Sequence, residues 1–282
     1  MADSTTTAAP PTVEAHGAKI PAIGLGTWRA GMDVVAEAVE AALKCGYRHI
    51  DTAIAYANEE GVGEGLRSGG VPRDEIFVTT KIPPDQIGAG ALERAAEGSL
   101  KRLKLDQVDL LLIHWPNPSI PLRESIRALC AAKREGLTRH IGVSNFPVAL
   151  LDEAVHRADE PIVTNQCEYH PRLDQTMLID SCRRHGIAFT SYAPLGRTQI
   201  LDDPVVTAIA SRLQRTPAQV ILRWHIQQPM VVAIPKSQSP ARIKENFGVF
   251  DFELPPEDMA ALSALARPDA RLVNPSWAPR WD

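Results

Sequence analysis

The sequence has few cysteines and no long apolar run, and each shortage excludes a class of protein. Four cysteines occur in 282 residues, and none forms a CxxC pair, so neither a disulfide framework nor a cysteine metal site is indicated. No apolar stretch approaches the roughly 20 residues that span a bilayer. The formal net charge of −4 does not favour nucleic acid or an anionic membrane as a partner. We therefore expect a soluble, cytoplasmic protein with reduced thiols.

The N-terminus also lacks the marks of an export signal. Its first residues, MADSTTTAAPPTVEA, contain neither a basic region nor an apolar core. Their small, polar, proline-containing composition predicts a disordered tail over residues 1–15. Residues 16–282 show no linker or break in composition, and their length suits one α/β barrel of roughly 250 residues. We therefore expect a single folded domain after the tail.

Short apolar runs alternate with amphipathic stretches along this domain, which is typical of βαβ units and a parallel sheet. An open, doubly wound sheet is the alternative, but GLGTWR does not fit the GxGxxG spacing expected after its first strand. The glycines of residues 59–70 follow no predicted strand, and we interpret them as part of a glycine-tolerant helix. Eight strand–helix repeats predict a closed (β/α)₈ barrel. The predicted strands are residues 22–28, 47–51, 76–81, 108–114, 140–145, 162–166, 187–192 and 231–236.

Polar side chains end most of these runs, and the strand ends of a closed barrel converge on one mouth. Each has an ordinary structural explanation alone, so their shared position is what indicates a site. Tyr56 lies on the loop after the second strand, and Lys81 ends the third. If the ammonium lies within a few ångström of the phenol, it lowers the pKa of Tyr56, while Asp51 keeps the ammonium charged. With His114 hydrogen-bonding the same substrate oxygen, this phenol would suit protonation of an alkoxide during carbonyl reduction.

A second group of residues favours an anion. The last predicted strand is followed by a polar loop and by a helix with Ser239 as its N-cap. Lys236, Ser237 and Arg242 crowd this helix N-terminus, where free N–H groups already attract an anion. A solvated basic loop is the alternative. Two cations suit a phosphate monoester better than a ribose diol, so NADPH is favoured over NADH as the cofactor.

The motifs GLGTW, DTAIAYANEE, VTTK, VDLLLIHWP, IGVSNF, NQCEYHP, SYAPLG and IPKSQSPARIKEN follow one another in this order. In this the chain resembles the aldo-keto reductases from about residue 20 onward. Within that family it is most similar to the bacterial 2,5-diketo-gluconate and methylglyoxal reductases. The resemblance implies a (β/α)₈ fold and NADPH-dependent reduction of aldehydes or ketones. It also implies a catalytic tetrad of Asp51, Tyr56, Lys81 and His114, with Tyr56 as the acid.

The resemblance further implies how the cofactor and substrate are bound, and a monomer is expected because members of this branch are often monomeric. The carboxamide positions are Ser144, Asn145 and Gln166, and the ring stacked on the nicotinamide is Tyr192. Leu195 and Gly196 lie along the pyrophosphate, Lys236, Ser237 and Arg242 at the 2′-phosphate, and Glu245 and Asn246 at the adenine. The substrate positions are Trp28 and Trp115 as pocket walls, and Trp277 and Trp281 in the C-terminal segment that covers the site.

The chain departs from the family pattern at two places. Pro83 stands where many relatives have a pocket tryptophan, so substrate preference cannot be copied from a relative. The loop after the seventh strand, SYAPLGRTQILDD, is short, which puts tight retention of NADPH in doubt. Two other functions stay open for this barrel: a Schiff-base aldolase that uses Lys81 or Lys236 as the amine, and a non-catalytic sensor of nicotinamide redox state.

Overall fold

Eight short apolar segments form the parallel strands at the centre of the molecule. In the computed structural model, which describes residues 10–282, these strands follow one another in chain order across one sheet. Parallel bridges from Ile23 to Ala233 and from Gly26 to Lys236 join its two edges, so the predicted barrel is confirmed. The strands are β3 (Leu25–Gly26), β4 (His49–Asp51), β5 (Phe77–Ile82), β6 (Val108–Ile113), β7 (Thr138–Ser144), β8 (Ile162–Glu168), β9 (Ala188–Tyr192) and β10 (Val231–Ala233).

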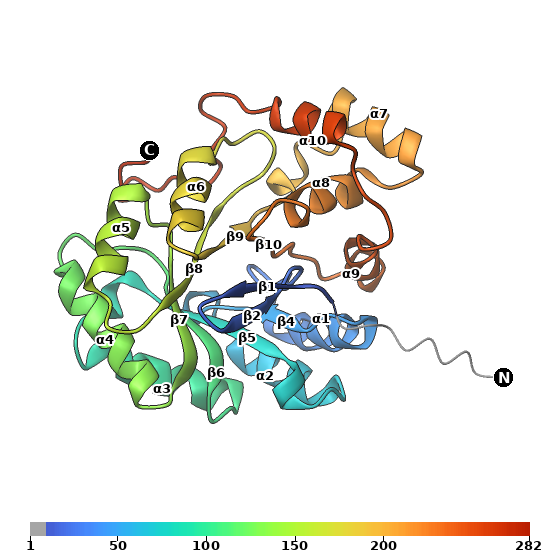
Figure 1. Cartoon of the computed structure of the whole chain (residues 1–282). Coiled ribbons are helices and arrows are strands. Elements are labelled where there is room, and N and C mark those ends of the chain that lie inside the picture. The colour runs from blue at the N-terminus through green and yellow to red at the C-terminus, as the bar shows by residue number, and fades with distance from the viewer. Residues whose placement is uncertain (1–9) are drawn as a thin grey trace.

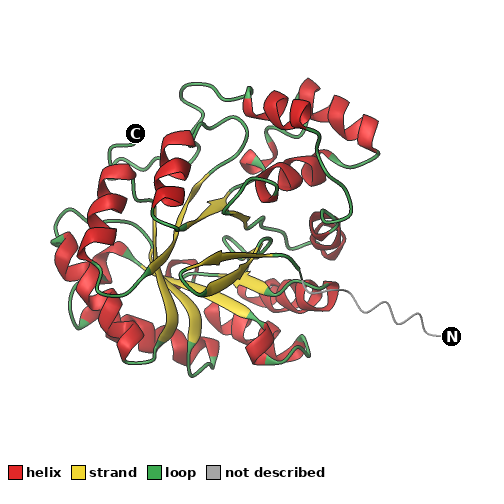
Figure 2. Ribbon diagram, viewed as in Figure 1, coloured by secondary structure: helices red, strands yellow, loops and turns green. Residues whose placement is uncertain are grey.

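Helices surround the strands (Figure 1), and the secondary-structure view shows the same ring of helices around a central sheet (Figure 2). Local sequence signals set several of their ends. For example, Thr216 caps the eighth helix in a capping box with Gln219, which satisfies otherwise free N–H groups. The helices are α1 (Met32–Cys45), α2 (Glu59–Ser68), α3 (Ala91–Leu103), α4 (Leu122–Arg134), α5 (Val148–Arg157), α6 (Thr176–Arg184), α7 (Pro204–Leu213), α8 (Pro217–Ile226), α9 (Pro240–Phe247) and α10 (Pro256–Ser263).

An N-terminal hairpin was not predicted. Strands β1 (Thr12–Ala15) and β2 (Ala18–Pro21) pair antiparallel, so the expectation of a disordered tail up to residue 15 is wrong for these strand residues. The two residues between the strands, His16 and Gly17, both have positive φ, as a tight hairpin turn requires. Residues 1–9 of the expected tail lie outside the described part of the chain. The buried side chains of the hairpin pack with residues that begin several barrel strands, so it covers the N-terminal end of the barrel.

The glycine cluster of residues 59–70 forms α2 and its end, as predicted, and Gly63 lets two helices pack closely. A Cβ on Gly63 would meet the carbonyl group of Leu103 at the end of α3, with the carbonyl carbon 2.7 Å away. We expect Gly63→Ala to lower the free energy of unfolding by about 1–2 kcal/mol, because backbone atoms must move apart. Urea denaturation measures this change.

Gly98 on α3 is the matched control for Gly63. A Cβ there meets only the end of the flexible Arg102 side chain, 3.3 Å away. Gly98→Ala should therefore leave stability unchanged or raise it by about 0.5–1 kcal/mol through helix propensity. Equal effects of the two substitutions would contradict close packing at Gly63.

Candidate active site

A buried ion pair lies at the carboxyl ends of β4 and β5, which are neighbours in the barrel. Lys81 is fully buried, and its ammonium donates to Asp51 Oδ1 at 2.5 Å and to the backbone oxygen of Thr52 at 2.8 Å. The other carboxylate oxygen of Asp51 accepts a hydrogen bond from Gln166 Nε2 at 2.7 Å. Both charges are therefore partnered, as buried ions must be.

Tyr56 lies beside this pair, on a short 3₁₀ turn (Ile54–Tyr56) after β4. Its hydroxyl is 3.4 Å from Lys81 Nζ, and the ammonium is also 5.1 Å from the centre of the ring. Buried Asn58 fixes the loop, since its side chain donates to the backbone oxygens of Thr27 and Ala30. The phenol and ammonium thus meet as the sequence predicts.

The pKa of Tyr56 does not follow the prediction. Burial raises it above its usual value of 10.0, and this effect outweighs the lowering by Lys81. Burial alone would lower the pKa of Lys81, but the charges of Asp51 and Tyr56 reverse the direction and raise it. The expected net lowering for Tyr56 is therefore wrong. At neutral pH the phenol holds its proton beside a charged ammonium, which is the state from which an acid donates.

His114 follows β6 and faces the same phenol. Its ring lies edge-on to that of Tyr56, with the two centroids 5.7 Å apart. Burial, and then the charge of Lys81, lower the pKa of His114 to about 3. The imidazole is therefore neutral near pH 7, so it can give a hydrogen bond without carrying a charge. Asn145 Nδ2 donates a hydrogen bond to the backbone oxygen of His114 at 3.0 Å.

The next three strands contribute polar side chains beside the tetrad. Ser144 donates to the backbone oxygen of Gln166 at 2.8 Å, and Tyr192 donates to Asn145 Oδ1 at 2.8 Å. Asn145 has φ of 63°, a conformation that asparagine tolerates better than most residues. These four predicted cofactor residues thus lie in one hydrogen-bonded group that extends from Asp51 to the end of β9.

The residues predicted to bind the 2′-phosphate lie around the start of α9. Ser239 is the N-cap residue as predicted, but its side chain makes no capping bond. Instead Ser237 Oγ accepts from the Ser239 N–H at 3.2 Å. Lys236 and Arg242 are exposed, and partial burial lowers the pKa of Lys236. The other cofactor candidates occupy the same side: Leu195 and Gly196 begin the turn after β9, Glu245 is half-buried on α9, and Asn246 is buried there.

Three of the four predicted substrate tryptophans pack together. Trp115 is buried after β6, and it contacts Trp277 and Trp281 edge-on at centroid distances of 5.1 and 6.0 Å. Trp28 is 38% exposed and packs against two cations, with the guanidinium carbons of Arg29 and Arg197 at 4.4 and 5.1 Å from its ring centre.

Several residues with a clear part in this site were missed from the sequence. Thr52 binds Lys81 through its backbone oxygen, which no side-chain pattern reveals. Asn58 lies within the motif DTAIAYANEE and could have been suspected as a loop anchor. Glu168 lies within NQCEYHP, but it accepts hydrogen bonds from the backbone amides of Leu272 and Val273, about a hundred positions away in the sequence.

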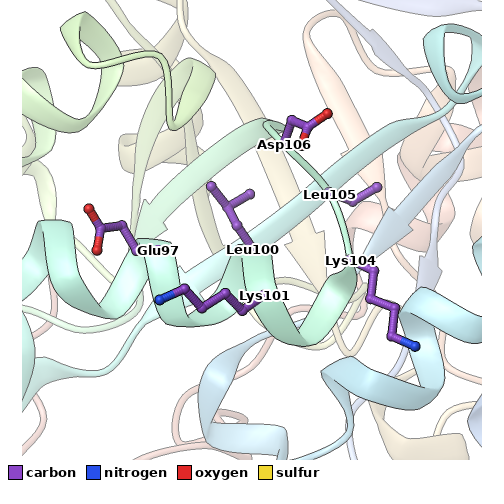
Figure 3. A pocket seen from close by; sticks show the side chains of 6 residues that line it. All are labelled: Glu97, Leu100, Lys101, Lys104, Leu105 and Asp106. Atoms are coloured by element: carbon purple, nitrogen blue, oxygen red, sulfur yellow. The ribbon is translucent and has the colours of Figure 1, made fainter.

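The open hollow drawn in Figure 3 lies away from this site. It is formed by the end of α3 and the loop that enters β6, so it belongs to the amino end of that strand. The tetrad lies at the opposite, carboxyl ends. In the stretch from residue 10 to residue 282, no helix is long and apolar enough to cross a membrane.

Comparison with known proteins identifies the family of this chain. Residues 22–267 match the model of the aldo/keto reductase family. Glyoxal reductase of Bacillus subtilis is 44% identical over 266 residues, covering 94% of this chain and 96% of the relative. Methylglyoxal reductase DkgB of Escherichia coli O157:H7 is 43% identical over 267 residues, covering 93% and 99%.

Solved structures give the same result. A protein provisionally assigned as a 2,5-diketo-D-gluconic acid reductase B superposes with a TM-score of 0.95 at 45% identity, covering 97% of this chain and 98% of that one. The aldo-keto reductase of Bombyx mori, solved in complex with NADP, superposes with a TM-score of 0.86 at 36% identity, covering 92% and 94%. By its family match and its reductase relatives, this barrel is thus that of an oxidoreductase. The chain belongs to the aldo/keto reductase family.

Proposed function

We propose that this protein uses NADPH to reduce small aldehydes and dicarbonyls, such as methylglyoxal, diketo-sugar acids and aromatic aldehydes, to alcohols. The observation that carries the proposal is the hydroxyl of Tyr56 within 3.4 Å of a buried, carboxylate-bound ammonium. The relatives named as glyoxal and methylglyoxal reductases support the substrate class. A cytoplasmic location and a monomeric state stay predictions.

The residues of the tetrad would divide the reaction between them. A bound nicotinamide supplies the hydride. As the carbonyl oxygen gains charge, Tyr56 donates its proton to it, and neutral His114 orients it through a hydrogen bond. The phenolate left on Tyr56 is stabilised by the ammonium of Lys81, which Asp51 holds charged and in place.

The residues present fit a phosphorylated dinucleotide. Ser144, Asn145 and Gln166 offer hydroxyl and amide groups next to the tetrad, as a carboxamide needs. The start of α9 has no side-chain cap, so its first N–H groups are open to an anion. Lys236 and Arg242 place positive charge at the same end. This set suits a 2′-phosphate better than a free ribose hydroxyl.

The test of the proposed function is a panel of methylglyoxal, diketo-sugar acids and aromatic aldehydes, each followed by the loss of NADPH absorbance. We expect turnover with at least one carbonyl, and slower turnover with NADH. Absence of turnover across the panel would count against reduction and favour the non-catalytic sensor of nicotinamide redox state.

The Schiff-base aldolase is a separate alternative. The raised pKa of Lys81 disfavours a Schiff base at that residue, because a Schiff base needs the neutral amine.

Cofactor selectivity should depend on the cations at α9. Replacing Lys236 and Arg242 together with methionine removes the charges proposed to bind the 2′-phosphate. We expect KM for NADPH to rise roughly 10- to 100-fold, the size of one or two lost charge-assisted hydrogen bonds. KM for NADH should stay nearly constant, because it has no phosphate there.

Lys244→Met is the matched control for this selectivity. Lys244 is also exposed on α9, but two positions along a helix do not share a face. It should change neither KM. An equal loss of NADPH and NADH binding in the double variant would show that these cations do not read the phosphate.

A further inference from the structure

The last twelve residues, 271–282, contain no helix or strand, yet they are held in a defined position. Figure 1 shows the C-terminus beside α5. There the Asp282 carboxylate accepts from the Val148 N–H at the start of the helix, at 2.9 Å. Trp281 also bonds within the segment, from its indole nitrogen to Asn274 Oδ1 at 3.0 Å. We call residues 271–282 the C-terminal segment.

The other end of the segment is held by Glu168. This glutamate ends β8 and has no exposed surface. Its Oε1 accepts from the Leu272 N–H, and its Oε2 accepts from the Val273 N–H, both at 2.7 Å. His170 Nε2 lies 3.0 Å from Oε1. A buried carboxylate thus binds two consecutive backbone amides of a segment without secondary structure.

Glu168 and Gln166 project from the same strand toward the same side. Side chains two positions apart share one face of a strand, and Gln166 binds the carboxylate of Asp51. One strand therefore holds the tetrad through Gln166 and the C-terminal segment through Glu168. The distance between the reacting groups and the segment is fixed by a single rigid element.

We propose that Glu168 is a positioning residue for the substrate pocket. By binding the Leu272 and Val273 amides, it holds the segment so that Trp277 and Trp281 pack against Trp115. Glu168 is fully buried and both of its carboxylate oxygens already accept hydrogen bonds, so it does not touch a substrate itself. The inference rests on the proposed function for its kinetic part, since the tryptophans are taken to contact the carbonyl compound.

The kinetic test is Glu168→Gln, which keeps the side-chain size. Glutamine has one acceptor oxygen, so one of the two backbone amides loses its partner. We expect KM for an aromatic aldehyde to rise about 10-fold, the size of one lost hydrogen bond to a charged group. The kcat and the affinity for NADPH should change less than about 3-fold, because the tetrad is untouched. Glu257→Gln, at an exposed glutamate on α10, is the control and should change nothing.

A mutant cycle separates positioning from general damage. If Glu168 acts through the tryptophans, Glu168→Gln should have little further effect on KM in a Trp277→Ala/Trp281→Ala protein. The same 10-fold rise in that background would overturn the proposal, because the effect would not pass through the C-terminal segment.

A test without turnover keeps this inference separate from the proposed function. Trypsin cleavage after Arg271, identified by mass, should be about 10-fold faster in Glu168→Gln than in the wild type, because the segment detaches more often. Unchanged cleavage would refute the anchoring role. Faster cleavage in a protein that reduces no carbonyl would support the anchor and reject the proposed function alone.

Discussion

Replacing Tyr56 with phenylalanine is expected to lower kcat for carbonyl reduction by at least ~10²-fold, the usual size of an acid–base contribution. The phenyl ring keeps its edge-on contact with His114, so the fold and NADPH binding should be retained. Only the hydroxyl beside Lys81 is lost. Stopped-flow or steady-state absorbance of NADPH measures the rate, and fluorescence titration measures cofactor binding.

Tyr169→Phe is the matched control for this substitution. Tyr169 is buried, and its hydroxyl donates to Gln228 Oε1 at 3.0 Å, away from the tetrad. It should keep nearly wild-type kcat. Unchanged turnover in Tyr56→Phe would reject Tyr56 as the acid.

The direction of the pKa shift of Tyr56 also bears on how kcat depends on pH. Because burial raises it, the phenol stays protonated through neutral pH, and its titration should not shape kcat between about pH 6 and 8. A fall in kcat with a midpoint near 7 that Tyr56→Phe abolishes would contradict this direction.

The barrel, and the grouping of Asp51, Tyr56, Lys81 and His114 at the carboxyl ends of its strands, could be predicted from the sequence because both follow local rules. Each strand is an apolar run, and Asp51, Lys81 and His114 mark the ends of three neighbouring runs. Parallel strands bring such ends together, so no knowledge of distant contacts was needed. The N-terminal hairpin was missed for a related reason: its strands are only four residues each, too short for a clear alternating pattern.

What could not be predicted depends on burial and on contacts between distant residues. The sign of the Tyr56 pKa shift is a balance between desolvation and the charge of Lys81, and the sequence reveals only the charge. The role of Glu168 was hidden because its acceptors meet amides 104 and 105 positions away. Backbone groups such as the oxygen of Thr52 carry no signature in the sequence.

The second large effect is expected from the ion pair itself. Asp51→Asn leaves the ammonium of Lys81 fully buried with only neutral partners, since its carboxylate contact at 2.5 Å is lost. We expect the free energy of unfolding, measured in urea, to fall by about 3–5 kcal/mol, the usual cost of a broken buried pair. The kcat should fall as well, because the ammonium next to Tyr56 is no longer held in place.

Removing both partners separates stability from chemistry. In Asp51→Asn/Lys81→Met no charge is left buried, so most of the lost stability should return, as when buried pairs are replaced by uncharged residues. Activity should not return, because no cation remains beside the phenol to stabilise its anion. If the double variant regained turnover together with stability, the pair would serve the fold alone, and Tyr56 would not depend on Lys81 for proton transfer. Recovery of stability with persistent loss of kcat would instead show that proton transfer from Tyr56 depends on the ammonium of Lys81.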